Sequence, residues 1–201
     1  MKVKICGITR LEDALFAAGQ GVDALGFVFA PSSPRYIDPD AAGCIVRSLP
    51  PFVTPVGVFV DEQREEILRA IAIAGIRCLQ LQGDEPPGET EGYPVPVIKG
   101  FRVGRNFDPQ LLRSYLTAAH LLDAQVAGTH GGTGKTFDWN IAVQAKEHGR
   151  IILSGGLTPE NVAEAARTVR PYAVDVSSGV ESLPGVKDPE RILRFIRALS
   201  V

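Results

Sequence analysis

Two side chains that can carry protons end short apolar segments of this 201-residue chain. Cys6 closes the segment Val3–Cys6, and Lys4 falls on the same side as Cys6 because side chains alternate along a strand. A neighbouring cation favours the thiolate form of a cysteine, so this pattern predicts a reactive Cys6. Asp123 ends a second apolar segment, where an unpaired carboxylate is costly to bury, and it is a candidate general acid or base. An ion pair with another inward group, such as Lys99, is the alternative interpretation of Asp123.

Two glycine-containing segments have the composition of anion-binding loops. Ser154-Gly155-Gly156-Leu157 leads into a predicted helix, and Ser177-Ser178-Gly179-Val180 follows the last predicted strand. Glycine lets main-chain N–H groups approach an anion closely, and the amino end of a helix favours negative charge. The alternative is that these glycines only turn the chain. Because the two loops follow consecutive strands, phosphate binding is the favoured interpretation, and its residues are Gly155, Gly156, Ser177, Ser178 and Gly179.

The glycine-rich segment Gly128–Thr136 does not fit the phosphate-binding loop of nucleotide-binding proteins. That motif, G-x-x-x-x-G-K-[ST], requires glycine at the position of Thr129. We interpret the segment as a mobile lid over the strand ends. The three histidines are scattered and no carboxylate–histidine cluster occurs, so no metal site is expected.

An alternating pattern of strands and helices must position these residues. Eight short segments rich in Val, Ile, Leu and Phe are typical of strands covered on both faces. They are Val3–Cys6, Ala24–Phe29, Pro55–Val60, Cys78–Gln82, Val95–Gly100, His120–Ala124, Ile151–Ser154 and Ala173–Ser177. Helical patterns lie at Leu11–Gly19, Pro39–Ser48, Glu62–Ala74, Pro109–Leu116, Trp139–His148, Pro159–Arg167 and Pro189–Leu199.

Local signals mark several helix ends. Asp38, Thr158 and Asp188 each precede a proline, as N-cap residues often do, and Gly75 and Gly149 lie where helices should end. The connection between residues 84 and 93 contains two prolines and two glycines, so it predicts a ragged turn or a very short helix.

Eight strands, nearly all followed by helices, predict an α/β fold: one small, phosphate-binding (β/α)8 TIM barrel that spans residues 1–201 as a single domain. An open doubly wound sheet is the alternative, but it would usually have fewer strands or a longer chain. In such a barrel the active site lies at the carboxyl ends of the strands, which places Gln82 there and Arg35 in the loop after the second strand. Alternation points Asp175 and Ser177 inward, and closure of the barrel predicts a buried ion pair between Asp175 and Lys4.

Composition excludes several classes of protein. Hydrophobic residues make up 45% and charged residues 22%, so the chain can bury a full core and is not disordered. A net charge of −2 argues against nucleic-acid binding. No apolar segment is long enough to span a membrane, and no secretory signal is visible. Three widely spaced cysteines form no disulfide framework, and Cys44 and Cys78 are interpreted as small core residues, so a cytoplasmic location is expected.

Several motifs, taken together and in order, resemble one family. They are KICGIT at Lys4–Thr9, GFVF at Gly26–Phe29, SPRY at Ser33–Tyr36, VGVFV at Val56–Val60, LLDA at Leu121–Ala124, GGTGKTFDW at Gly131–Trp139, LSGGL at Leu153–Leu157 and VDVSSGVE at Val174–Glu181. The chain resembles phosphoribosylanthranilate isomerase over its whole length. KICGIT together with DVSSGVE is specific, whereas LSGGL alone is shared by many phosphate-binding barrels.

The resemblance implies an intramolecular aldose–ketose isomerase of tryptophan biosynthesis. Its reaction is the Amadori rearrangement of N-(5-phosphoribosyl)anthranilate to 1-(2-carboxyphenylamino)-1-deoxyribulose 5-phosphate, without cofactor or metal. The family's catalytic cysteine and aspartate match Cys6 and Asp123, its carboxylate-binding arginine matches Arg35, and Gln82 and Asp175 are assigned to substrate binding. The expected partner is this small phosphosugar-anthranilate substrate, with no nucleic acid or membrane, and the chain is expected to be a monomer or a homodimer.

One position departs from the family pattern. The family commonly has histidine where this chain has Gln82, which can hydrogen-bond a substrate but cannot carry a proton. We therefore interpret Gln82 as a positioning residue. Two alternatives stay open: another phosphosugar barrel enzyme, which would need opposed carboxylates or metal-binding histidines, and a non-enzymatic barrel that senses a phosphorylated ligand.

Overall fold

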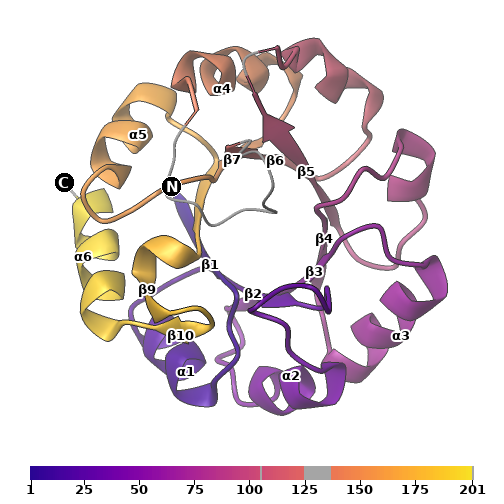
Figure 1. The fold of residues 1–201 in the computed structure, drawn as a ribbon, viewed down its shortest axis with the longest axis vertical. Coiled ribbons are helices and arrows are strands. Elements are labelled where there is room, and N and C mark those ends of the chain that lie inside the picture. Colours follow the sequence, from indigo (N-terminus) through magenta and orange to yellow (C-terminus); the bar gives the residue numbers. More distant parts are fainter. Residues whose placement is uncertain (105, 125–136, 201) are drawn as a thin grey trace.

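The computed structural model describes residues 1–104, 106–124 and 137–200. Eight parallel strands close into a barrel in chain order, with β8 paired to β1, and helices surround it (Figure 1). The strands are β1 (Lys2–Cys6), β2 (Ala24–Val28), β3 (Thr54–Phe59), β4 (Cys78–Leu81), β5 (Val97–Val103), β6 (Ala119–Ala124), β7 (Ile151–Leu153) and β8 (Ala173–Val176). This closed barrel confirms the predicted fold class and excludes the open doubly wound sheet.

The helices on the outside are shorter than the pattern predicts at several places. They are α1 (Leu11–Gly19), α2 (Pro39–Val46), α3 (Arg64–Ala74), α4 (Trp139–Ala145), α5 (Val162–Val169) and α6 (Pro189–Leu199). The described residues also form the 3-10 helices η1 (Pro87–Thr90), η2 (Pro109–Ser114), η3 (Lys146–His148) and η4 (Ser178–Val180). The very short helix expected between residues 84 and 93 is confirmed as η1, whereas the predicted helix at Pro109–Leu116 forms only η2.

Most of the predicted helix ends are confirmed. The carboxylates of Asp38 and Asp188 accept hydrogen bonds from the first main-chain N–H groups of α2 and α6, and Gly75 ends α3 in a left-handed conformation. Thr158 differs, because α5 begins only at Val162. The side chain of Thr158 caps a single preceding turn, in which it accepts a hydrogen bond from the main-chain N–H of Glu160.

A hairpin that the sequence analysis did not predict follows β8. Its antiparallel strands are β9 (Glu181–Leu183) and β10 (Val186–Lys187), joined by a turn in which Gly185 has φ +80°. In Figure 1 the hairpin lies between α1 and α6, beside the end of β1. It therefore adds a small element to the side of the barrel where β8 meets β1.

Two apolar layers build the core. The larger one lies between the strands and the helices and contains the fully buried Phe27, Phe59 and Phe195. The smaller one fills the barrel at the amino ends of its strands with Val56, Ile98, Ala119, Leu121, Ile152 and Ala173. The polar inward side chains are thereby confined to the carboxyl ends, above an apolar floor.

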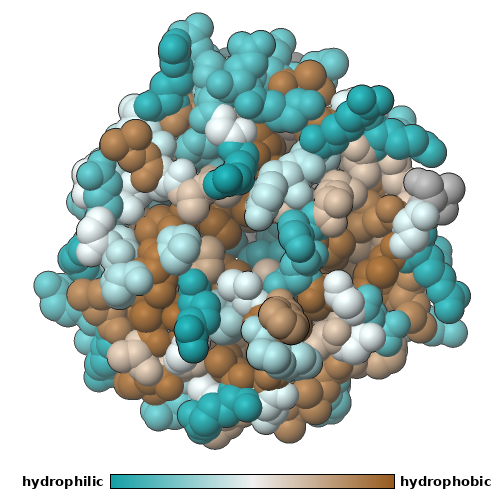
Figure 2. Space-filling view, turned by 180° about the vertical axis from the view of Figure 1, so that it is seen from behind, coloured by the Kyte–Doolittle hydropathy of each residue, from teal (hydrophilic) through white to brown (hydrophobic). Residues whose placement is uncertain are grey.

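The outer surface carries hydrophobic side chains in patches between hydrophilic ones (Figure 2). Phe52, in the connection between α2 and β3, is 94% exposed, the highest value among the large hydrophobic residues that the structure describes. None of the described helices combines the length and apolarity needed to cross a membrane.

Candidate active site

One pocket of about 430 Å³ opens at the carboxyl ends of the strands. It is lined by every residue that the sequence analysis assigned to the site: Cys6, Arg35, Gln82, Asp123, Gly155, Gly156, Asp175, Ser177, Ser178 and Gly179. These residues come from strands and loops that span most of the chain, so closure of the barrel brings them together. Val28, Ala30, Val58 and Val60 form an apolar wall next to Cys6.

Cys6 is buried at the end of β1, beside the ammonium group of Lys4. Burial raises the pKa of the thiol, and the opposing effect of Lys4 is too small to cancel it. The prediction that Lys4 makes the thiolate the favoured form is therefore wrong for the unliganded protein. The physical reason is that desolvation acts on the whole thiolate charge, whereas Asp175 neutralises much of the Lys4 charge.

Lys4 and Asp175 form the buried ion pair that the strand pattern predicts. The Lys4 Nζ and the Asp175 Oδ1 are 2.9 Å apart, and both side chains are almost completely buried. Burial opposes the charge on Lys4, but Asp175 and Cys6 outweigh it and raise its pKa. The pair lies just below Cys6 and fixes a cation under the thiol.

Asp123 lies on β6, across the pocket from β1, and two strands separate the two positions on one side of the barrel. Burial raises the pKa of this carboxyl from 3.8 to about 6, and the charge of Asp175 adds to the shift. The alternative partner Lys99 points outward and pairs instead with Glu85, at 3.1 Å. Asp123 thus has the environment of a group that can keep a proton close to neutral pH.

The glycine loops after β7 and β8 touch each other. A Cβ at Gly179 would overlap the main-chain carbonyl of Leu157, so only glycine allows this approach. Gly155 and Gly156 have φ +83° and φ +65°, in the left-handed region. The main-chain N–H groups of Gly155, Gly156, Ser178 and Gly179 donate to no other described residue. Together with the buried, unpartnered Ser177 Oγ, they leave a group of donors at one edge of the pocket.

Gln82 follows β4 and lines the pocket, and its side chain lies against Gly100 of the neighbouring strand β5. Its amide fills the space where Gly100 of β5 would carry a Cβ, and its Oε1 accepts a hydrogen bond of 2.8 Å from the Gln80 Nε2. The Gln80 Oε1 is buried without a partner. The side chain is thus held by packing and by Gln80, as a positioning role requires.

Arg35 lines the pocket, and two residues that the sequence analysis missed hold it there. The Arg35 Nε and Nη2 donate to the two carboxylate oxygens of Glu181 at 2.8 and 2.7 Å, and the Lys187 Nζ lies 2.7 Å from the Glu181 Oε1. Glu181 and Lys187 face each other across the β9–β10 hairpin. The dipeptide Pro184-Gly185 between them is the one local signal that could have indicated a turn there.

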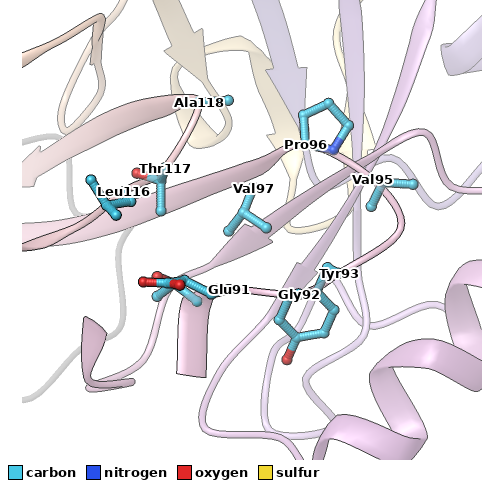
Figure 3. A pocket seen from close by; sticks show the side chains of 10 residues that line it. Glu91, Gly92, Tyr93, Val95, Pro96, Val97, Leu116, Thr117 and Ala118 are labelled. Carbon is cyan, nitrogen blue, oxygen red and sulfur yellow. The ribbon is translucent and has the colours of Figure 1, made fainter. Parts of the chain in front are cut away.

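A second hollow of about 360 Å³ lies at the amino ends of β5 and β6, opposite to the first pocket (Figure 3). Main chain and apolar side chains such as Val95 and Leu116 form most of its wall, and Glu91 is the one charged residue among the described residues that line it. The polar side chains of Thr90, Tyr93 and Thr117 line it beside Glu91, but no cysteine, histidine or second carboxylate is among the described residues of its wall. The predicted lid, Gly128–Thr136, lies outside the described residues.

A closed eight-stranded barrel with a thiol and a carboxyl at the carboxyl ends of its strands has the architecture of a (β/α)8-barrel enzyme. The family model of N-(5'phosphoribosyl)anthranilate (PRA) isomerase matches residues 3–198. The chain belongs to this family, and it is an isomerase of the aldose–ketose type in tryptophan biosynthesis.

Individual relatives agree along the whole chain. The N-(5'-phosphoribosyl)anthranilate isomerase of Citrifermentans bemidjiense is 53% identical over 195 residues, which cover 97% of this chain and 95% of the relative. The crystal structure of phosphoribosyl anthranilate isomerase from Thermus thermophilus is 44% identical, with a TM-score of 0.92, and the match covers 100% of this chain and 98% of that one. A third relative was solved in complex with reduced 1-(o-carboxyphenylamino)-1-deoxyribulose 5-phosphate; it is 43% identical, with a TM-score of 0.88 and the same coverage.

Proposed function

We propose that the pocket at the carboxyl ends of the strands converts N-(5-phosphoribosyl)anthranilate to 1-(2-carboxyphenylamino)-1-deoxyribulose 5-phosphate, with Cys6 as the base and Asp123 as the acid. The observation that carries the proposal is the placement of a buried thiol and a partly buried carboxyl on separate strands that face one pocket. An isomerisation that opens a ring and moves a proton needs one acid and one base on different sides of the ligand. No cofactor takes part in the proposed steps.

The substrate has three parts, and the pocket offers a different surface to each. The phosphate binds the free main-chain N–H groups of the loops at Gly155-Gly156 and Ser177-Ser178-Gly179. The aromatic ring lies against the apolar wall, and its carboxylate pairs with Arg35. We assign Gln82 and Asp175 to the ribose hydroxyl groups, because both line the same pocket and both carry hydrogen-bonding oxygens.

The reaction then proceeds in two proton transfers. Asp123, protonated, gives its proton to the furanose ring oxygen, and the ring opens to a Schiff base. Cys6, as thiolate, removes the proton from C2′, which gives an enolamine. Tautomerisation of the enolamine yields the ketone, and each catalytic group is reset by exchange with solvent before the next turnover.

Turnover by the purified chain and growth of a tryptophan auxotroph that lacks this step test the proposal together. We expect the chain to restore growth without tryptophan and to convert the substrate in buffer that contains a chelator. Failure to turn over the substrate, in a preparation with an intact fold, would contradict the proposal.

The assembly and location of the protein are also proposals. We infer a homodimer, because a related phosphoribosylantranilate isomerase from Thermotoga maritima is described as dimeric and because Phe52 is almost fully exposed. The molar mass from light scattering tests it, and a monomer at micromolar concentration contradicts it. We further propose that residues 1–201 work as one catalytic domain in the cytoplasm without nucleic acid as partner.

A further inference from the structure

The proposed reaction makes no use of two buried charged residues on the β9–β10 hairpin. Glu181 and Lys187 are 6% and 3% exposed, and neither lines the pocket. A buried ion pair is weak evidence for stability, since apolar residues of similar volume often serve the fold as well. Because stability alone does not explain the pair, its contacts with other residues are the guide to its role.

The carboxylate of Glu181 holds one edge of the Arg35 guanidinium. It accepts from the Nε at 2.8 Å and from the Nη2 at 2.7 Å, a bidentate contact that fixes the plane of the group. The other N–H groups of Arg35, on Nη1 and on the outer side of Nη2, donate to no described residue. They form a second fork that can receive a second carboxylate, and Arg35 lines the pocket whereas Glu181 does not.

The aliphatic part of Arg35 lies on the main chain next to the catalytic cysteine. A Cβ at Gly7 would be 2.6 Å from the Arg35 Cδ, and Gly7 has φ +77°, so glycine at this position lets the side chain pass. The guanidinium is thus constrained from two sides, by Gly7 under its stem and by Glu181 at its edge.

Lys187 connects the same carboxylate to the main chain of the site. Its Nζ donates to the Glu181 Oε1 at 2.7 Å, to the main-chain oxygen of Cys6 at 2.6 Å and to that of Ser177 at 3.4 Å. The hairpin itself is fixed to the barrel by hydrogen bonds from the Thr9 hydroxyl to the Gly185 oxygen and from the Lys187 N–H to Asp13.

We propose that Glu181 is a positioning residue that holds the Arg35 guanidinium with its free edge toward the anthranilate carboxylate, and that Lys187 sets the place of Glu181 relative to Cys6 and Ser177. The hairpin thereby fixes the position of the carboxylate-binding Arg35 relative to the base Cys6 and to the phosphate loop at Ser177. This inference rests on the proposed role of Arg35 in binding that carboxylate.

A double-mutant cycle tests the proposal with two substrates. KM and kcat are measured for the wild type, Glu181→Gln, Arg35→Ala and the double variant, on the substrate and on its analogue without the carboxylate, N-(5-phosphoribosyl)aniline. For Glu181→Gln we expect KM of the carboxylated substrate to rise about tenfold, which corresponds to about 1.4 kcal/mol, with kcat nearly unchanged. We expect no such rise with the analogue, and no further rise when Glu181→Gln is added to Arg35→Ala.

Controls keep the result independent of folding. Removal of Glu181 leaves the buried Lys187 and the partly buried Arg35 without their counterion, so Glu181→Asp is the second variant. It keeps the charge, but its side chain is one methylene too short for the bidentate contact. Glu66→Gln, which breaks the exposed pair between Glu66 and Arg69 on α3, is the matched control and should change neither constant. Circular dichroism confirms the fold of each variant.

The outcomes separate this proposal from the proposed function. Equal KM increases for the substrate and the analogue, or fully additive effects of Glu181→Gln and Arg35→Ala, would show that Glu181 acts on the fold alone and would overturn the positioning role. If Arg35→Ala itself does not discriminate between the two substrates, both the carboxylate-binding role of Arg35 and the proposal built on it fail. Loss of turnover in the wild type would instead refute the proposed function.

Discussion

The resting protonation states of Cys6 and Asp123 are the reverse of those that the proposed reaction uses. The pKa of the Asp123 carboxyl is about 6, and burial places the pKa of the Cys6 thiol above its ordinary value. Between these values the resting protein carries a thiol and a carboxylate, whereas catalysis uses a thiolate and a protonated carboxyl. Both forms have the same number of protons, so the working form is a small and constant fraction over this pH range.

The pH profile of kcat/KM should therefore be bell-shaped, with the general acid Asp123 setting the acid limb and the general base Cys6 setting the alkaline limb. Below about pH 6 both groups are protonated, so the acid limb reports Asp123. Above the Cys6 pKa both groups are ionised, so the alkaline limb reports the thiol. The rate of Cys6 alkylation against pH gives the thiol pKa separately, and it should match the alkaline limb; agreement with the acid limb would mean that the thiolate is the resting form.

Asp123→Asn should lose activity and gain stability. The native carboxyl has a pKa of about 6 against an ordinary 3.8, so the folded state binds the proton more tightly and the free energy of unfolding falls as pH rises between these values. A neutral amide removes this cost: we expect roughly 1–3 kcal/mol higher stability at pH 7.5, little gain at pH 4, and a kcat lower by about 10²–10⁴-fold. Urea unfolding at both pH values and kinetic assays check this, and an equal effect of the substitution at both pH values would assign the change to packing.

Alternation along strands was sufficient to predict which polar residues enter the pocket, because the side-chain direction in a strand is a local property. Cys6, Asp123 and Asp175 follow from this rule. Glu181 and Lys187 do not, since their roles depend on contacts with Arg35 and Cys6 across long stretches of chain. The thiol pKa could not be predicted either, because it is set by the balance of burial against charge.

At the scale of the elements, glycines on neighbouring strands make room for the functional side chains. A Cβ at Gly26 of β2 would be 2.8 Å from the Cys6 Sγ and 3.2 Å from the Lys4 Cε. Gly26→Ala should therefore displace the thiol and lower kcat while KM changes little, at a cost in stability of about 1–3 kcal/mol. Ala14→Gly in α1, a buried change outside the pocket, is a control for lost stability; a loss of kcat in that variant as large as in Gly26→Ala would contradict a local effect.

The loop after β7 should determine phosphate affinity. Gly156 has φ +65°, and a β-branched residue there is strained and blocks the approach of an anion to the main-chain N–H groups. We expect Gly156→Val to raise KM strongly and to weaken competitive inhibition by inorganic phosphate to a similar extent. An unchanged phosphate inhibition constant in a folded variant would move the phosphate site to another part of the pocket.

Some helix boundaries could be predicted from short sequence signals, and others could not. The amino ends of α2 and α6 follow from an aspartate directly before a proline, a signal contained in two residues. The fourth and fifth connections form the 3-10 helices η1 and η2. Prolines at positions 86 and 87 interrupt a helical pattern in the fourth connection, and Leu112 is the one buried residue within η2. The β9–β10 hairpin was missed since its strands are three and two residues long and carry no alternating pattern.

At the scale of the whole molecule, the Lys4–Asp175 ion pair joins β1 to β8, the first and the last strand of the barrel. Lys4→Met alone leaves a buried carboxylate without its partner and should destabilise the protein by about 3–5 kcal/mol. The double variant Lys4→Met/Asp175→Leu should be more stable than Lys4→Met, because no uncompensated charge stays inside the barrel. Urea unfolding of the two variants checks the order, and a further loss of stability in the double variant would show that the pair is not coupled.

Because the Lys4–Asp175 pair lies beneath the site, the site can be complete only after Asp175 has been synthesised. Lys4 and Asp175 are 171 positions apart, which at ribosomal speeds corresponds to roughly 10–30 s. Until β8 leaves the ribosome, β1 has β2 as a hydrogen-bonding neighbour on one side, but it lacks β8 on the other side and the anion that compensates its buried ammonium. A nascent chain can fold only part of the barrel in that interval, and the unpaired edge of its sheet stays exposed. The catalytic site therefore forms in one late step, when β8 pairs with β1, and not gradually as the nascent chain becomes longer.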